Sequence, residues 1–134
     1  MTKAREMLDR FPRSLSIDAQ LLAKTIDALS ECESTCTQCA DACLAEDDVQ
    51  PLVKCITLNL DCADVCSATR RVISRQAEYE PDLIRPLLQA CVASCKSCGD
   101  ECEHHAAHMP HCATCAESCR SCERACRELL NATS

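Results

Sequence analysis

Residues of low polarity recur every three or four positions along most of this chain, which is the spacing of one face of an α-helix. From residue 22 to residue 43 the repeat is unbroken, with aliphatic residues at 22, 26 and 29 and cysteines at 32, 36, 39 and 43. The pattern predicts a long helix that is capped by Ser14 or Ser16 and ends near Glu46. Its buried face would change halfway from hydrocarbon to sulfur. The acidic residues at 46–48 are expected to form a solvated cap.

Three later segments carry similar stripes, and a proline suited to a first helical turn precedes or opens each of them. The second long helix follows Pro51 and places Asn59 between two cysteines of its stripe. The third is expected to begin near Pro81, with aliphatic residues leading in phase into its cysteines, and the fourth near Pro110. The sixteen cysteines of the four stripes are Cys32, Cys36, Cys39, Cys43, Cys55, Cys62, Cys66, Cys91, Cys95, Cys98, Cys102, Cys112, Cys115, Cys119, Cys122 and Cys126.

These elements predict an all-α fold, an antiparallel four-helix bundle with a short N-terminal extra helix. Residues 1–134 are expected to form a single domain, with the short helix at 3–11 and the bundle at about 14–131. The short helix would place Ala4, Met7, Leu8 and Phe11 on one side. With one glycine and two aromatic residues, the composition also favours helices and leaves the ordinary apolar core thin.

Short connections between consecutive helices favour antiparallel neighbours. The cysteines lie late in the first and third long helices and early in the second and fourth, so all four stripes should fall in the same half of the bundle. Aliphatic residues should fill the other half: Leu22, Ile26, Ile73, Leu87 and Leu130. The connection at 103–111, which holds all four histidines and Met109, should lie over the open end of the sulfur column. Ile56 and Leu60 form a second apolar line, expected to face the short helix or another subunit.

Charge and terminal sequence narrow the function classes. The net charge of −7 disfavours nucleic acid as a partner. No apolar run approaches the roughly 20 residues needed to span a bilayer, so no membrane association is expected. Residues 1–10 are charged and show no signal peptide. We therefore expect a cytoplasmic protein whose thiols stay reduced.

A column of thiols is a binding site for soft cations, because thiolates select Cu(I), zinc and Fe–S clusters. Zinc and Fe–S clusters need compact pockets of four ligands, usually supplied by loops. Cu(I) accepts two or three thiolates, and a thiolate can bridge two ions. Sixteen thiolates would then hold about 16 ions, and histidine, methionine or asparagine ligands would raise the total to about 16 to 20. An Fe–S redox carrier, a zinc or soft-metal buffer, disulfides and plain packing remain alternatives.

The chain resembles the cytosolic copper storage proteins. The resemblance rests on the four in-phase cysteine rows, on CADACL at 39–44, on LNLDCADVC at 58–66, and on the histidine- and methionine-bearing connection before Cys112. It implies a non-enzymatic Cu(I) store, a homotetramer of four-helix bundles that fills from the histidine end. A copper chaperone or acceptor would be its partner. By position His105 best matches a ligand at the mouth, followed by His111. His108 and Met109 are further candidates, and Asn59 would either bind copper or donate hydrogen bonds.

Overall fold

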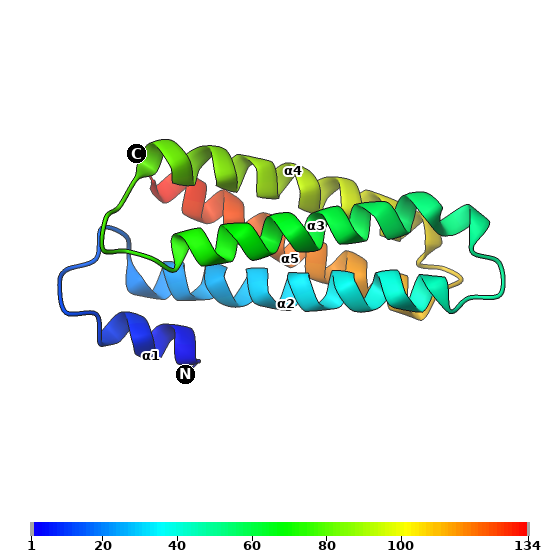
Figure 1. The fold of residues 1–134 in the computed structure, drawn as a ribbon, viewed down its shortest axis with the longest axis horizontal. Coiled ribbons are helices and arrows are strands. Elements are labelled where there is room, and N and C mark those ends of the chain that lie inside the picture. The colour runs from blue at the N-terminus through cyan, green and yellow to red at the C-terminus, as the bar shows by residue number, and fades with distance from the viewer. Residues whose placement is uncertain (1, 134) are drawn as a thin grey trace.

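Five α-helices and one turn of 3-10 helix make up the computed structural model, which describes residues 2–133. The elements are α1 (Lys3–Asp9), α2 (Ala19–Leu44), η1 (Gln50–Leu52), α3 (Val53–Ile73), α4 (Pro81–His105) and α5 (Pro110–Ala132). Helices α2 to α5 run antiparallel to their chain neighbours and form a closed ring, because α2 and α4 each pack against both α3 and α5 (Figure 1). The predicted all-α, antiparallel four-helix bundle with a short N-terminal helix is confirmed. None of the described helices is both long and apolar enough to cross a membrane.

The start of α2 differs from the sequence prediction. Asp18, rather than Ser14 or Ser16, is the N-cap, and its Oδ1 accepts a hydrogen bond from the backbone N–H of Leu21 at 2.9 Å. This bond satisfies one of the amides that a helix start leaves without a partner. The two serines are exposed and precede the helix. By contrast, α4 begins at Pro81 and α5 at Pro110, as the proline pattern predicted.

Both chain ends lie in the same half of the bundle (Figure 1). The interior of this half is filled by hydrocarbon. Its fully buried aliphatic side chains are Leu22, Leu29, Ile73, Leu88 and Leu129. The expectation that Leu87 fills this half was wrong, because Leu87 is only half-buried and is not among the residues of the core cluster or packed against it. Leu130 is half-buried and packs against the edge of the core. Leu88 and Leu129 continue the cysteine faces of α4 and α5 at steps of three residues, and the core therefore takes them instead.

Helix α1 packs against α2 near the hydrocarbon half. Leu8 is the buried residue of α1, whereas Met7 is 70% exposed. The buried side of α1 is therefore narrower than the side of four apolar residues that the sequence predicted. Helix α1 does not cover the Ile56–Leu60 line, which lies toward the other end of the bundle on α3. Leu60 is 46% exposed and Ile56 is half-buried.

Candidate metal centre

All sixteen cysteines face the interior of the bundle, in rows that run from about its middle toward the end opposite the chain ends. They lie in the part of the chain that the structure describes, and all are free thiols. Cys39 is 2% exposed and every other cysteine is fully inaccessible to solvent. Because steps of three and four residues return to one side of a helix, each of the four long helices contributes one row of thiols to this column.

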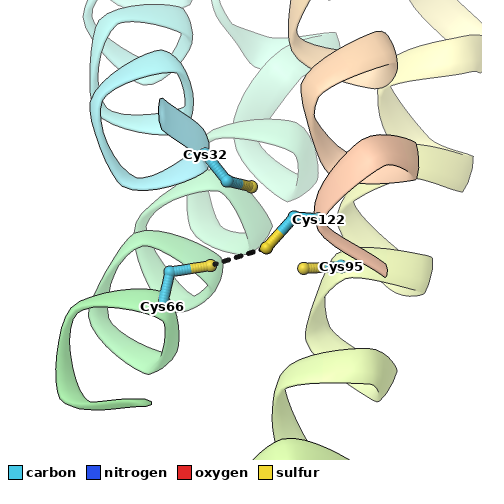
Figure 2. Close-up of side chains that lie close together, drawn as sticks. All are labelled: Cys32, Cys66, Cys95 and Cys122. Atoms are coloured by element: carbon cyan, nitrogen blue, oxygen red, sulfur yellow. Dashed lines mark hydrogen bonds between the residues drawn. The ribbon is translucent and has the colours of Figure 1, made fainter. Parts of the chain in front are cut away.

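One level of the column shows how the four helices converge. Cys32 of α2, Cys66 of α3, Cys95 of α4 and Cys122 of α5 point toward one another, and their sulfurs lie within 4.8 Å of each other (Figure 2). The Sγ atoms of Cys66 and Cys122 are 4.0 Å apart. Four chain segments distant in sequence thus bring four thiols to one point on the bundle axis.

The sulfur spacing across the helices suits a bridging metal. Cys36 Sγ lies 3.7 Å from Cys119 Sγ and 4.0 Å from Cys98 Sγ, and Cys55 Sγ lies 3.9 Å from Cys102 Sγ. These separations are about twice an S–S bond. With metal–sulfur bonds of about 2.3 Å, trigonal coordination separates the sulfurs by about 4.0 Å and tetrahedral coordination by about 3.8 Å. The column can accept a soft ion between neighbouring thiols with little movement.

Neighbouring groups in the column share their thiols. Cys32 belongs both to the group of Figure 2 and to one with Cys36, Cys62 and Cys119. Cys36 and Cys119 in turn recur in a group with Cys98 and Cys115. A closed tetrahedral site needs four ligands of its own, so these groups cannot all be filled as separate sites. They can be filled together only if thiolates bridge adjacent ions.

Asn59 is fully buried inside the column, at the stripe position between Cys55 and Cys62. Its Oδ1 accepts hydrogen bonds from Cys98 Sγ at 3.0 Å and from Cys115 Sγ at 3.4 Å. Its Nδ2 donates to Cys55 Sγ at 3.8 Å. A buried amide without partners would be costly, and these thiols satisfy it. The amide group therefore belongs to the same network as the sulfurs.

His111 is the histidine that reaches the thiols. Its Nδ1 lies 3.4 Å from Cys39 Sγ and 3.6 Å from Cys112 Sγ, while Nε2 lies 3.0 Å from Glu46 Oε2. A proton on Nε2, held by the carboxylate, leaves the Nδ1 lone pair directed at the sulfurs, which is the arrangement of a metal-binding histidine. Glu46, expected as part of a solvated cap at 46–48, thus also has a hydrogen-bond partner in His111.

The other residues of the connection are less involved. His105 Nε2 lies 3.1 Å from Glu101 Oε2 on the same helix, and its side chain is 19% exposed. His108 is exposed, and Met109 is half-buried and packs against the core. Sequence reasoning missed both carboxylates. The Glu101–His105 spacing of four residues was a usable signal, whereas the Glu46–His111 contact joins α5 to the segment after α2 and leaves no local signature.

Burial and thiol hydrogen bonds shift the acidity of the column in both directions. Burial raises the pKa of Cys43 from 9.0 to about 11 and that of Cys112 to about 12. A hydrogen bond from Cys102 lowers the pKa of Cys55 to about 3, because a donated S–H stabilises the neighbouring thiolate. The network can therefore support a thiolate beside protonated neighbours.

Helices α4 and α5 are held together beside the column by Arg120. Its guanidinium contacts Asp100 at 2.6 Å and Glu103 at 2.9 Å. A Cβ atom at Gly99 would come within 2.9 Å of Arg120 Nη1, so the glycine makes room for this side chain. The neighbour that approaches Gly99 closely is thus an arginine side chain of α5.

Comparisons with known proteins agree with this geometry. A family model described as copper storage protein matches residues 18–131. The chain is similar to the copper storage protein Ccsp from Streptomyces lividans loaded with 10 copper equivalents, with a TM-score of 0.95 and 46% identity over 97% of this chain and 99% of that one. A structure on copper loading to a cytosolic copper storage protein of the same organism, with five coppers, gives 0.85 and 50% over 86% and 96%. The Cu(I)-bound copper storage protein BsCsp3 gives 0.70 and 29% over 79% and 94%. No curated protein matches.

Proposed function

The chain belongs to the copper storage protein family, and we propose that it stores about 16 to 20 Cu(I) ions on the thiolates that line its bundle. The metal ligands would be the sixteen cysteines, from Cys32 to Cys126, with a small contribution from the residues at the end of the column. Storage requires binding and release and no chemical conversion, so the proposal assigns the protein no enzymatic activity.

The single observation that carries this proposal is the sharing of thiols between adjacent groups. Cu(I) takes two or three thiolates and tolerates bridging sulfur, so a continuous array can fill without leaving ligands unused. Closed mononuclear zinc sites or Fe–S clusters would instead use some groups and exclude their neighbours. The continuous array therefore favours Cu(I) over the zinc-buffer and Fe–S alternatives.

Charge neutralisation supports the same assignment. Burying ionised thiolates without compensation would be prohibitively costly. One Cu(I) per thiolate cancels the charge of the column as it fills, whereas one divalent ion per thiolate would leave a large positive charge. Each thiol gives up its proton when it binds the metal, so affinity should fall as the pH is lowered.

The residues at the end of the column would assist the binding of incoming Cu(I), and they would contribute little to the number of ions stored. His111 is the best placed, because Nδ1 lies 3.4 Å from Cys39 Sγ. We propose His105, His108 and Met109 as weaker auxiliary ligands. For Asn59 the contacts with thiols favour a hydrogen-bonding role, since a hard amide oxygen is a poor ligand for a soft ion.

The cellular setting is also part of the proposal. The similarity to a cytosolic copper storage protein from Streptomyces lividans supports a cytoplasmic location. A copper chaperone or acceptor would exchange ions with the store. The exposed side chains of Leu44, Val53 and Leu60 on α2 and α3 suit burial between copies of the chain in a homotetramer.

Anaerobic titration with Cu(I) against a competing chelator tests the proposal. We expect between about 16 and 20 ions to be retained per chain, with near-ultraviolet absorption and no visible colour. Saturation near four ions, or stronger retention of zinc than of Cu(I), would overturn it. A brown protein after reconstitution with iron and sulfide would favour the Fe–S carrier.

A further inference from the structure

Copper binding expels protons from an interior that is closed to solvent. Each thiol that binds Cu(I) gives up its proton. Cys39 is 2% exposed, and every other cysteine of the column is fully inaccessible. The deeper sulfurs therefore have no exposed surface at which a proton could pass directly to water. Their protons have to leave through hydrogen-bonded neighbours.

The deeper thiols are connected to one another through Cys62. Its Sγ lies 3.9 Å from Cys66 Sγ, 3.9 Å from Cys95 Sγ and 4.0 Å from Cys32 Sγ. These three neighbours of Cys62 belong to the level shown in Figure 2. Cys66 continues the chain to Cys91, with 3.8 Å between the two sulfurs. Protons can move along such a chain, because an S–H group can both donate and accept.

Ser94 of α4 joins this chain of thiols to the surface of the bundle. Its hydroxyl donates to Cys62 Sγ at 3.9 Å and to the backbone carbonyl of Cys91 at 3.1 Å. A hydroxyl has one proton, so it donates fully to only one of these two acceptors at a time. While it donates to the carbonyl, its oxygen can accept the Cys62 S–H. Ser94 is half-buried and therefore borders both the thiols and the solvent.

Two other polar side chains of the described residues form hydrogen bonds with the thiols. Asn59 is fully buried and cannot pass a proton to water. His111 contacts Cys39 and Cys112, which lie at the end of the column. Cu(I) bound at that end would repel protons that leave past it, because like charges repel. The side of the bundle at Ser94, between α3 and α4, has no such obstacle.

We infer that Ser94 relays protons from the deeper thiols to solvent as Cu(I) binds. The inference rests on the proposed storage function and adds the path of the released protons. In the transfer, Cys62 gives its proton to Ser94 Oγ while the Ser94 hydroxyl proton passes to water. The sulfur keeps the electron pair of the S–H bond and donates it to Cu(I), as the ligand that delivered the ion is released. One Cu(I) replaces one proton, and no oxidation state changes.

Hydrogen–deuterium exchange of the copper-free protein tests the relay without any metal. The S–H stretching band in the infrared is followed after transfer of the reduced protein into D2O under nitrogen. Ser94→Thr keeps the hydroxyl, and Ser94→Val has nearly the shape of threonine without it. We expect the slowest phase of S–H exchange to slow about fivefold or more in Ser94→Val and to stay close to wild type in Ser94→Thr. Equal rates in Ser94→Val and wild type, or the same slowing in both variants, would overturn the inference.

Loading with Cu(I) supplies a second readout. Copper uptake is followed in the near-ultraviolet, and proton release is followed with a pH indicator in the same stopped-flow experiment. Ser94→Val should slow the later part of both signals and still reach the wild-type copper capacity. The control is Ser67→Ala, a half-buried serine of α3 that is not among the hydrogen-bond partners of Cys62, and it should leave both rates unchanged. Unchanged loading in Ser94→Val would contradict the relay.

Two safeguards separate the possible failures. If Ser94→Val does not fold, Ser94→Ala takes its place beside Ser94→Thr, with the same outcomes. A low copper capacity in the wild-type protein would count against the storage function itself, while the exchange rates of the copper-free protein would still decide whether Ser94 carries the protons.

Discussion

The two halves of the bundle use the same four helices and the same three-and-four spacing, yet their interiors serve different purposes. In the hydrocarbon half, Leu22, Leu29 and Leu88 are fully buried, and burial of each such side chain contributes roughly 1.5–3 kcal/mol to folding. In the sulfur half, small side chains contact one another through weak S–H hydrogen bonds of 3.7–4.0 Å. The hydrocarbon half thus holds the four helices together, and this keeps the thiol ligands of the sulfur half in position.

This division has a physical reason. Free thiols behave as small hydrophobes with weak donors, so a column of them packs adequately while protonated. It cannot match the packing of leucine, because each side chain is short. The sulfur half is therefore the less stable half without metal and gains most from it.

Leu88→Ala should have the largest effect on folding and none on storage. We expect the free energy of unfolding of the copper-free protein to fall by about 3 kcal/mol, because a fully buried leucine leaves a cavity. Urea denaturation measures this, and titration of the folded variant should return the wild-type copper count. Leu83→Ala, at a 52% exposed position of α4, is the matched control and should change stability by less than about 0.5 kcal/mol. A reduced copper capacity in folded Leu88→Ala would contradict the view that the hydrocarbon half stabilises the fold without binding copper.

Cys95→Ala should lower the copper capacity and have only a small effect on folding stability. Cys95 shares a group with Cys32, Cys66 and Cys122, so its removal should cost at least one ion of the array. The copper-free protein should lose only about 1 kcal/mol of stability. Titration and denaturation of the same sample measure both, with Ser97→Ala, an exposed position on α4, as the control. Unchanged capacity would argue that the central thiols are packing residues.

Alkaline pH should weaken the copper-free protein alone. The pKa of Cys43 is raised from 9.0 to about 11 and that of Cys112 to about 12. Between pH 9 and 12 the folded state then holds more protons at these thiols than the unfolded state does, and stability should fall as the pH rises through this window. The loaded protein has already lost these protons and should show no matching fall. Melting temperatures measured from pH 8 to 11 test this, and a flat or rising curve for the copper-free protein would contradict it.

The smallest effect on capacity should come from the histidines. His111→Ala should slow loading several-fold and remove at most about one ion, because His111 reaches the sulfurs. His105→Ala should slow it less, since the His105 ring is hydrogen bonded to Glu101. Stopped-flow loading with Cu(I) compares the two. Equal loading rates in both variants and the wild type would show that the histidines do not assist loading.

Much of this architecture could be predicted from the sequence because the helical period does not depend on the chemistry of the buried residue. Steps of three and four residues define one face for leucine and cysteine alike. This spacing predicted the four rows of cysteines, their position at one end of the bundle, and the place of Asn59 among them. The register of the hydrocarbon half was less certain, since adjacent leucines such as Leu87 and Leu88 compete for one core position and only packing decides between them.

Contacts between segments distant in sequence could not be predicted. The Glu46–His111 pair joins residues 65 positions apart, and nothing local marks it. The full burial of Leu52 depends on how η1 packs against α3 and the core. The ranking of His105 ahead of His111 followed the resemblance, whereas the contacts with Cys39 and Cys112 favour His111.

X-ray absorption spectroscopy of the fully loaded protein tests the central claim most directly, because it reports the ligands of copper and its nearest metal neighbours together. Bridging thiolates predict two to three sulfur ligands per Cu(I), at about 2.3 Å, together with a clear copper–copper scattering path. A first shell dominated by nitrogen or oxygen, or isolated copper ions without a metal neighbour, would contradict the account.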